Sequence, residues 1–410
     1  MAEARRSFLF LQGPVGRFFD RLGHELSRHG HGVARVNFNG GDELTWSGPN
    51  AVRFDRPPSA WPDQLAEVVR CHAVTDVLLF GDCRPRHIIA RRMLRPHGIR
   101  VHVFEEGYFR PDWITHERNG VNGLSPLPRE PEWYHHEAAR LDGRSWPTVR
   151  PVGPSLAGLT REAIRYYAAV AARQAHYPHA RVHRPIDPAD EARLWLRRAV
   201  ELPTRRRTAR ARQATLLESG HPFFLLALQL DADMQIRRHS RFTGMAEVLN
   251  EVIGSFARCA PSDARLAIKN HPLDCARFDL DAVVGTLSRR AGVSRRVSFI
   301  DGGDLPALLD RATGMVVVNS TAGLSSLHRS VPTIVLGRAI YDIAGLTHDA
   351  RHRSGDRLDA FWREPEPPSM DLYRAFRRVV IERTQVNGGF YTERGLDRAV
   401  PLAAERLAAA

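Results

Sequence analysis

Lysine is almost missing from this chain: Lys269 is the only one, so arginine carries nearly all of the positive charge. Cysteine is also scarce. The four cysteines form no CxxC pair and are too few for a disulfide framework, so we expect reduced, unligated thiols. No apolar run approaches the roughly 20 residues that a membrane span needs, which argues against an integral membrane protein. The first apolar segment, residues 8–11, is too short for a signal sequence. We therefore expect a cytoplasmic protein.

The formal net charge of +13 indicates anionic partners, which include phospholipid surfaces, phosphorylated small molecules and nucleic acid. More than half of that excess lies between residues 161 and 220, where thirteen arginines stand against six acids. This segment is expected to form two long helices, with Tyr166, Tyr167, Trp195 and Leu196 interleaved among the arginines. It fits a solvated hairpin packed on the protein or a helix pair on an anionic bilayer, and less well a nucleic-acid binder.

Apolar segments alternate with amphipathic helical stretches at the spacing of βα units, in two separate series. We expect strands at 8–11, 33–38, 77–80 and 100–104, then at 223–230, 265–268, 297–300, 315–318 and 333–336. The pattern predicts an α/β fold with two Rossmann-like domains facing a cleft. The expected parts are an N-terminal α/β acceptor and catalytic domain (1–150), a basic helical insert (151–220), a C-terminal nucleotide-binding domain (221–367) and a C-terminal helix packing back on the N-terminal domain (368–410).

An acidic pair ends the fourth expected strand, in the run Glu105-Glu106-Gly107. Ligands of such sheets bind beyond the carboxyl ends of the strands, so at least one carboxylate is placed to meet a ligand. Side chains alternate along a strand, and we expect Glu106 to face the ligand and Glu105 to bond to backbone or arginine. Alternatively, the pair caps a helix or pairs with arginine. The other strand ends carry Gln12, Asn39, Asp82 and Arg84, and Arg110 follows the acidic pair.

The second series has two candidate anion-binding segments. Lys269-Asn270-His271-Pro272 comes directly after a strand, and proline biases the backbone of His271 toward an extended conformation. Ser320, Thr321 and Ser325 lie where another strand leads into a helix, and amides and hydroxyls at a helix N-terminus bind anions. Each segment alone is also explained by a turn or a helix cap. Together they predict a nucleotide phosphate site.

Common cofactor signatures are missing. The chain has neither GxGxxG nor GxxxxGK[ST], which argues against redox and kinase chemistry of those classes. Asp231-Ala232-Asp233 imitates a metal-binding DxD motif, but hydrogen bonding to a ligand or to arginine is the preferred interpretation. We therefore predict no cofactor and no metal.

Longer strings of the sequence resemble the KpsS/LipB-type capsule polysaccharide proteins. They are Leu11–Gly16, Arg35–Asp42, Leu79–Pro85, Val103–Thr115, Gln229–Asp233, Lys269–Pro272, Asn319–Gly323 and Gln385–Tyr391. The resemblance covers most of the chain outside the helical insert. It implies a GT-B-like β-Kdo transferase without a cofactor. Such an enzyme uses CMP-β-Kdo to start the oligo-Kdo linker on a lysophosphatidylglycerol anchor, at the cytoplasmic face of the inner membrane, alongside other capsule biosynthesis proteins and without nucleic acid.

The resemblance also implies roles for individual residues. Glu106 would be the nucleophile that traps the sugar after CMP leaves, which gives retention of configuration. Glu105 and Asp82 are the alternative candidates for this role. Lys269, His271, Pro272, Ser320, Thr321 and Ser325 would form the phosphate site, and His271 would also assist catalysis by neutralising the leaving group. Gln12, Asn39, Arg84 and Arg110 would contact Kdo or the acceptor. One departure is that related Kdo transferases often have aspartate where this chain has Glu106.

Two other functions fit the same residues. One is a different CMP-sugar transferase, such as a sialyltransferase-like enzyme, which shares acid-acid-glycine and His-Pro elements. The other is a non-catalytic capsule assembly or export factor that docks through its basic helices. The first predicts activity with another donor. The second predicts that Glu106 and His271 are dispensable whereas the arginines between 193 and 212 are not.

Overall fold

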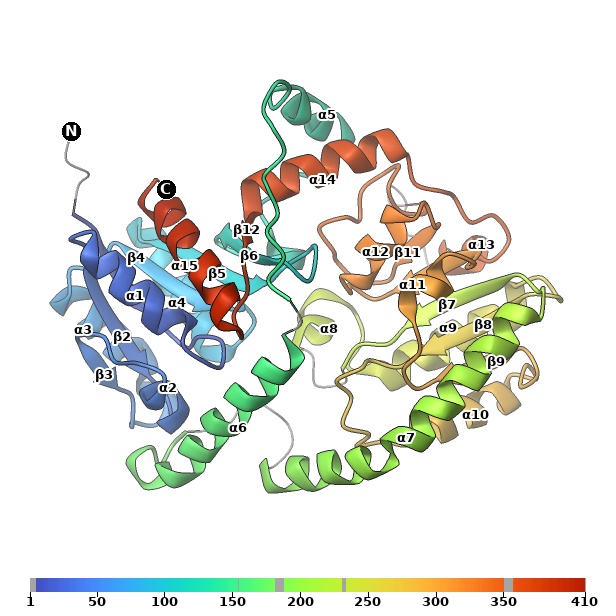
Figure 1. Cartoon of the computed structure of the whole chain (residues 1–410), viewed down its shortest axis with the longest axis horizontal. Coiled ribbons are helices and arrows are strands. Elements are labelled where there is room, and N and C mark those ends of the chain that lie inside the picture. The colour runs from blue at the N-terminus through green and yellow to red at the C-terminus, as the bar shows by residue number, and fades with distance from the viewer. Residues whose placement is uncertain (1–4, 154, 181–187, 231–233, 350–356, 410) are drawn as a thin grey trace. The chain divides into compact units, whose positions relative to one another are not determined.

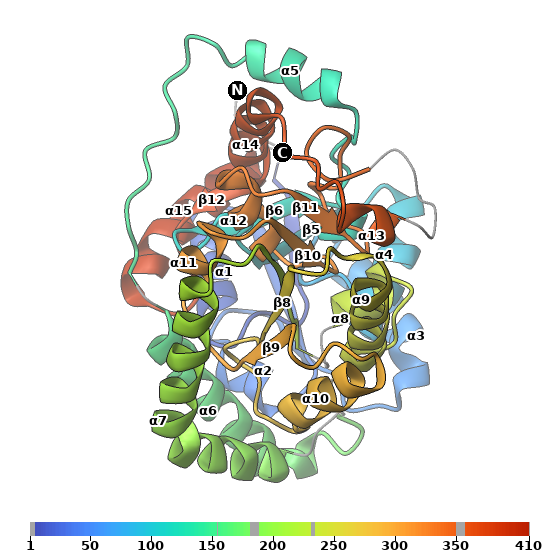
Figure 2. The same cartoon turned by 90° about the vertical axis from the view of Figure 1, so that its right-hand side faces the viewer.

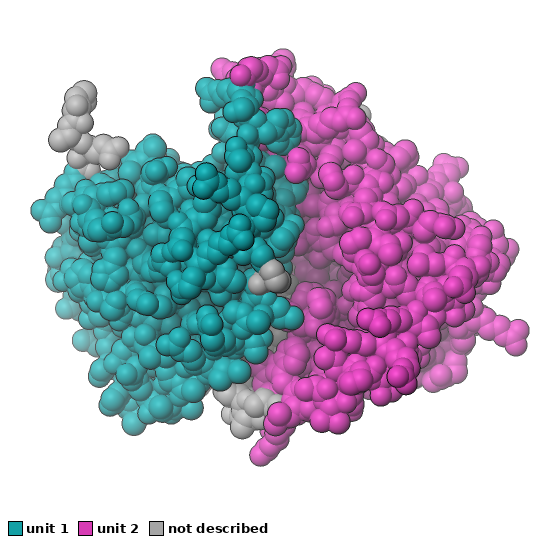
Figure 3. Space-filling model, in the orientation of Figure 1, with its two compact units in different colours: residues 1–126, 144–183, 380–410 teal, residues 127–143, 184–379 magenta. Residues whose placement is uncertain are grey.

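The computed structural model describes residues 5–153, 155–180, 188–230, 234–349 and 357–409. The chain divides into two compact units (Figure 3). Unit 1 comprises Met1–Pro126, Arg144–His183 and Val380–Ala410, and unit 2 comprises Leu127–Gly143 and Arg184–Val379. Each unit contains a predominantly parallel sheet covered by helices, which confirms the α/β class expected from the two series of apolar segments.

The sheet of unit 1 has the strand order β12-β6-β5-β4-β1-β2-β3. Its strands are β1 (Ser7–Phe10), β2 (Gly32–Asn37), β3 (Ala51–Arg53), β4 (Asp76–Phe80), β5 (Arg100–Glu106), β6 (Trp113–Arg118) and β12 (Gln385–Asn387). Strands β1 to β5 are parallel, whereas β6 pairs antiparallel with β5 and with β12. The sequence pattern missed β6 because its buried residues Thr115, His116 and Glu117 are polar.

Both faces of this sheet are buried. Phe8 and Phe10 of β1 pack on one face with α1 (Phe18–Arg28) and α15 (Glu393–Ala408), which lie side by side (Figure 1). Leu9 and Leu11 point to the opposite face, toward α3 (Trp61–Cys71) and α4 (Pro85–Leu94). A continuous apolar run is what a strand covered on both faces requires. The short helix α2 (Gly40–Leu44) follows β2.

Unit 2 contains a parallel sheet in the order β11-β10-β7-β8-β9. Its strands are β7 (Phe223–Ala227), β8 (Arg265–Lys269), β9 (Val297–Ile300), β10 (Gly314–Val317) and β11 (Thr333–Val335), so the five expected strands are present. Its helices include α8 (Met234–His239), α9 (Met245–Cys259), α10 (Leu280–Arg290), α11 (Leu305–Leu309), α12 (Ala322–His328) and α13 (Arg357–Phe361). The apolar faces of α9, α10 and α13 cover one face of the sheet.

The segments between and after the sheets divide differently from the expected boundaries. Of the expected insert 151–220, α6 (Leu156–Ala172) belongs to unit 1, and α7 (Pro188–Glu218) belongs to unit 2, where it runs along β9 (Figure 2). The helix α5 (Pro131–Ala139), expected in the N-terminal domain, lies in unit 2 and packs Tyr134 against Phe376 of α14 (Met370–Thr384). Within 368–410, the part that packs on α1 is α15. These assignments depend on tertiary burial, which boundary signals in the sequence do not encode.

Within the described ranges, no helix combines the length and the apolar character needed to cross a bilayer.

Candidate functional site

The strand order of unit 1 places a topological switch point between β1 and β4, because the chain runs from β1 outward to β2 and β3 and then returns to the other side of β1. Ligands of doubly wound sheets bind beyond the carboxyl ends of the strands at such a point. Gln12 follows β1, Asp82 follows β4, and the acidic pair ends the adjacent strand β5. The structure therefore brings the expected residues of the first series to one edge of one sheet.

Glu105 is partly buried at this edge. Its Oε1 accepts a hydrogen bond from the backbone N–H of Glu106 at 3.2 Å, and its Oε2 lies over Gly81, 3.2 Å from the position a Cβ atom there would take. Burial raises the pKa of Glu105 to about 7. The charges of Glu106 and Asp82 act in the same direction, while the Glu106 N–H and Arg84 oppose them. Near neutral pH this carboxyl is thus able both to hold and to release a proton.

The neighbouring Glu106 is held by a residue far away in the sequence. The hydroxyl of Tyr391 donates a hydrogen bond of 2.7 Å to Glu106 Oε1. Burial, and next the charge of Glu106, raise the pKa of Tyr391 well above its ordinary value, so the phenol remains a donor at neutral pH. Tyr391 lay within a string that carried the family resemblance, but no local pattern in the sequence linked it to the acidic pair.

The raised pKa of Glu105 has a consequence for stability. The native carboxyl binds its proton more tightly than the unfolded chain does, so the free energy of unfolding should fall as pH rises from about 4.5 to about 7. Glu105→Gln mimics the protonated form, and we expect it to stabilise unit 1 by about 2 kcal/mol at pH 8 and by little at pH 4.5, as thermal unfolding would show. Glu132→Gln, at an exposed position, is the control. A pH-independent difference between wild type and Glu105→Gln would contradict the prediction.

The surroundings of Asp82 differ from those expected of an alternative nucleophile. Its side chain is 0% exposed, and its two carboxylate oxygens accept hydrogen bonds from Cys83 Sγ at 3.1 Å and from the backbone N–H of Val121 at 2.9 Å. A nucleophile must reach a substrate carbon. The contacts of Asp82 instead tie the β4 end to the segment after β6, and its charge acts on Glu105.

Gln12 and Asn39, expected to contact the sugar or the acceptor, both bind Tyr166 of α6. The Gln12 and Asn39 side-chain amides donate to the Tyr166 hydroxyl at 3.0 and 2.9 Å, and that hydroxyl donates to Asp42 Oδ1 at 2.8 Å. Gly41 allows the approach, because a Cβ there would lie 2.6 Å from the Tyr166 ring. Tyr166, taken from sequence as one of the apolar residues of a possible bilayer-facing helix, is only 6% exposed. These amides position α6 at the sheet edge.

The two arginines of the expected acceptor set lie close to the acidic pair. Arg84 reaches the carbonyl oxygen of Gly13 at 3.4 Å, and its guanidinium lies 5.5 Å from the centre of the Phe80 ring. Arg110 reaches the carbonyl oxygen of Gly107 at 3.4 Å through Nε. These two contacts with backbone oxygens are long and weak. Other N–H groups of each guanidinium can therefore bind a carboxylate or a phosphate.

Unit 2 has its own switch point, between β7 and β10. The side chains of Gln229 and Asn319 join the two strand ends there: Gln229 Nε2 donates to Asn319 Oδ1 at 2.8 Å, and the Asn319 N–H donates to Gln229 Oε1 at 3.2 Å. Ser320 follows Asn319, and the Lys269–His271 segment ends β8 on the other side of β7. Sequence reasoning had not singled out this amide pair, because a tertiary pairing across 90 residues carries no local signal.

Within the His-Pro segment, the hydrogen bonds fix the orientation of the imidazole. Nδ1 of His271 accepts from the backbone N–H of Leu273 at 3.1 Å, so Nε2 carries the proton of the neutral ring. Lys269 is 8% exposed; burial lowers its pKa, while Asp301 and Asp304 oppose that shift. Asn270 donates to Asp274 at 3.0 Å and to Asp301 at 2.9 Å, which stabilises the turn. Pro272 lies at an exposed position in the same turn.

The serine segment begins α12. Ser320 Oγ accepts from the backbone N–H of Ala322 at 3.2 Å, and the Ser320 carbonyl accepts from the Tyr341 hydroxyl. Thr321 occupies the N-cap position without a capping side-chain bond. Ser325 is partly buried on the first turns of the helix. The two candidate anion segments thus lie at the carboxyl edge of one sheet, flanking β7. The expected motif at Asp231 and Asp233 lies outside the described residues.

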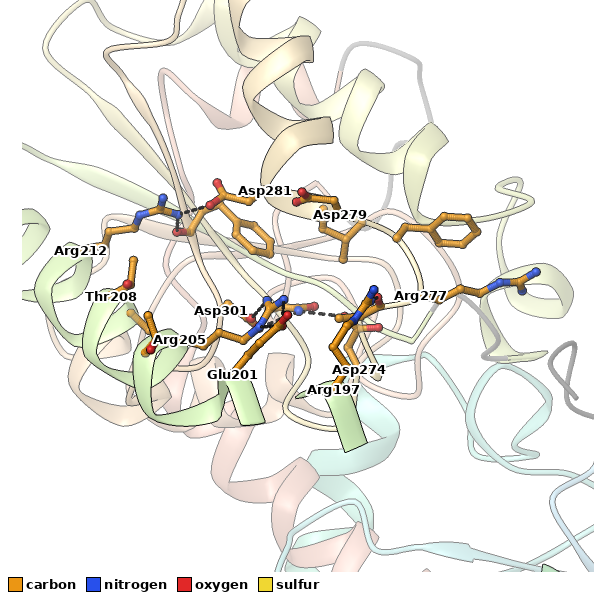
Figure 4. Close-up of a pocket in the computed structure, with 17 residues that line it drawn as sticks. Arg197, Glu201, Arg205, Thr208, Arg212, Asp274, Arg277, Asp279, Asp281 and Asp301 are labelled. Atoms are coloured by element: carbon orange, nitrogen blue, oxygen red, sulfur yellow. Dashed lines mark hydrogen bonds and ion pairs between the residues drawn. The ribbon is translucent and has the colours of Figure 1, made fainter. Parts of the chain in front are cut away.

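A cavity of about 530 Å³ opens beside the His-Pro segment, between α7 and the loop that connects β8 to α10 (Figure 4). Asp301 lies on its wall and accepts hydrogen bonds from Arg198, Arg205 and Asn270. Burial alone would raise the pKa of Asp301, but these hydrogen bonds lower it to about 2. The cavity wall is therefore made of arginines and acids that largely satisfy one another.

Comparison with known proteins gives consistent matches over most of the chain. A family model described as "Capsule polysaccharide biosynthesis protein" matches residues 75–391. The capsule polysaccharide export protein KpsS of Escherichia coli is 35% identical over 387 residues, which are 94% of this chain and 97% of that protein. The capsule polysaccharide modification protein LipB of Neisseria meningitidis serogroup B is 35% identical over 402 residues, with coverages of 96% and 93%. Among solved structures, the KpsC β-Kdo 2,7 transferase of Thermosulfurimonas dismutans matches with a TM-score of 0.45 and 11% identity, covering 98% of this chain and 100% of that one.

Proposed function

This chain belongs to the family of capsule polysaccharide biosynthesis proteins, and on that basis we propose that it is a β-Kdo transferase. The donor is CMP-β-Kdo, and the acceptor is a lysophosphatidylglycerol-type lipid at the cytoplasmic face of the inner membrane. The observation that carries the proposal is the pair of carboxylates at the end of β5, of which Glu106 is oriented by Tyr391 and Glu105 has a pKa of about 7.

The first step removes CMP. The C2–O bond to the phosphate breaks, its electron pair leaves with CMP, and Glu106 attacks C2 from the opposite side to form a covalent Kdo-enzyme ester. Lys269, the Nε2–H of His271 and the amides at the start of α12 neutralise the charge that develops on the phosphate.

In the second step an acceptor hydroxyl attacks C2 and releases the Glu106 carboxylate. The hydroxyl proton needs a base, and a carboxyl with a pKa of about 7 is well matched to accept it. We assign that role to Glu105. Two displacements at C2 give overall retention, and Arg84 and Arg110 bind the Kdo carboxylate or the acceptor phosphate through guanidinium forks.

Mass spectrometry of the acceptor tests the proposal directly. The protein is incubated with synthetic lysophosphatidylglycerol and CMP-Kdo generated in situ, and the expected product has gained the mass of one Kdo. A parallel panel with other CMP-sugars tests the sialyltransferase-like alternative. Transfer from another donor but not from CMP-Kdo would replace the assigned substrate, and no transfer from any donor would argue against an enzyme.

A non-catalytic role in capsule assembly or export is the second candidate, favoured by the word "export" in the name of the Escherichia coli relative. Complementation of a capsule-forming host strain that lacks the homologous gene distinguishes this role from that of a transferase. If Glu106→Gln restores capsule as well as the wild type does, the carboxylate is not needed and the assembly role is supported.

A further inference from the structure

The helix α7 has two opposite stripes of different character. Residues on one stripe face the body of unit 2, and they recur every three or four positions: Arg198, Leu202, Arg205, Ala209, Arg212 and Leu216. The opposite stripe follows the same spacing and is exposed: Leu196, Val200, Pro203, Arg207 and Arg210, with Arg206 at its flank. This spacing places each set on one side of an α-helix.

Ion pairs to unit 2 account for the arginines of the inner stripe. Arg198 and Arg205 bind Asp301, and Arg212 bonds to Asp281 and to the carbonyl oxygen of Phe299. These contacts, together with buried Ala209 and Leu216, hold the helix against β9. The contacts of the inner stripe therefore explain why α7 packs on the rest of unit 2, and these contacts do not involve the outer stripe.

The outer stripe has no such explanation. In its N-terminal half, Leu196 is 70% exposed and Val200 is 82% exposed. The partly exposed indole of Trp195 lies at the flank. Its C-terminal half carries Arg206, Arg207 and Arg210, which within the described residues form no ion pair and no side-chain hydrogen bond. These three arginines and Pro203 line a hollow of about 310 Å³. Between Leu196 and Arg210 the described stripe carries no acid, since Glu201 points to the flank and pairs with Arg205, and Glu218 follows on this side only at the C-terminal end of α7.

We propose that the outer stripe of α7 binds the surface of an anionic phospholipid bilayer. Leu196 and Val200 insert at the boundary between headgroups and acyl chains, and the arginine hollow binds lipid phosphates. A helix that combines exposed apolar residues with unpaired arginines matches an interface that is apolar on one side and negatively charged on the other. The inference deepens the proposed function and rests on it for its biological setting, because a lipid-linked acceptor requires the protein to work at a membrane surface.

Vesicle co-sedimentation of the full chain, without donor or acceptor, tests this surface. Vesicles of phosphatidylcholine with and without about a third of phosphatidylglycerol are compared at low and at raised salt. Each surface arginine contributes about a fivefold gain in binding to anionic membranes, so the triple change R206Q/R207Q/R210Q should weaken binding to the anionic vesicles about a hundredfold. The change L196S/V200S should weaken binding to a similar extent at both salt concentrations.

The matched control is R290Q/R295Q/R311Q, which removes the same charge from exposed positions of unit 2 outside α7. Equal losses in this control and in the α7 variant would overturn the proposal, because they would show a response to net charge alone. Equal binding of the wild type to neutral and anionic vesicles would overturn it as well. Circular dichroism confirms that each variant is folded.

Transfer to a short-chain, water-soluble acceptor distinguishes this inference from the proposed function. The α7 variants should retain wild-type transfer to that acceptor and lose transfer to vesicle-embedded acceptor. A wild type that binds anionic vesicles but transfers no Kdo to either acceptor would refute the enzyme assignment and leave the lipid surface standing. A wild type that transfers Kdo but does not bind vesicles would refute the lipid surface alone.

Discussion

Replacing Glu106 with glutamine is expected to lower Kdo transfer by about three orders of magnitude or more, while the affinity for CMP stays within about twofold. Glutamine has nearly the same shape and keeps an acceptor for the Tyr391 hydroxyl, but it cannot form the ester with C2. Initial rates followed by mass spectrometry and calorimetric titration with CMP give the two quantities. Glu106→Asp should retain more activity than Glu106→Gln, because a carboxylate remains.

Three further variants separate the role of Glu106 from its surroundings. Tyr391→Phe removes the 2.7 Å hydrogen bond to Oε1 and should reduce kcat by about tenfold with a shifted pH profile, since the nucleophile remains but is less well oriented. Glu105→Gln should slow the second step and remove the loss of rate below about pH 7. Glu132→Gln, an exposed change in unit 2, should have no effect. If Glu106→Gln retained a tenth of the wild-type rate, Glu106 would not be the nucleophile.

Gly107→Ala is expected to be the most damaging small substitution at the acidic pair, with a loss of about 3 kcal/mol or more in the free energy of unfolding. A Cβ atom on Gly107 would lie 2.1 Å from the carbonyl oxygen of Trp113 and 2.6 Å from its carbonyl carbon. Both are backbone atoms beside the antiparallel pair of β5 and β6, so no side-chain rotation can relieve the overlap. Thermal unfolding measures the loss.

Gly254→Ala provides the comparison for that substitution. Gly254 lies inside α9, and a Cβ there would meet only the flexible end of Arg258 at 3.4 Å. Alanine is the better helix former, so this variant should gain up to about 1 kcal/mol. Equal unfolding temperatures for Gly107→Ala and the wild type would show that the β5–β6 turn adapts, and the steric argument for the acid-acid-glycine run would be wrong.

Local patterns in the sequence were sufficient to predict those strands of both sheets whose residues are continuously apolar. They also located the polar residues that end those strands, because in parallel sheets the carboxyl ends share an edge. The acidic pair, the His-Pro turn and the serine segment were found in this way, and the structure places each at such an edge. Strands β3, β6 and β12 were missed, since β6 buries polar residues and β3 and β12 have only three residues each.

What the chain's sequence determined by itself was therefore the α/β class, the strand ends and the residue types available for chemistry there. The tertiary structure decided which of those residues are accessible and what each one contacts: Asp82 is buried on a backbone amide, Gln12 and Asn39 are engaged by Tyr166, and Glu106 is held by Tyr391. The reason is physical. Periodicity reports burial along a single element, whereas hydrogen bonds and pKa values depend on partners that are distant in the chain, as Tyr391 is from Glu106 across 285 residues.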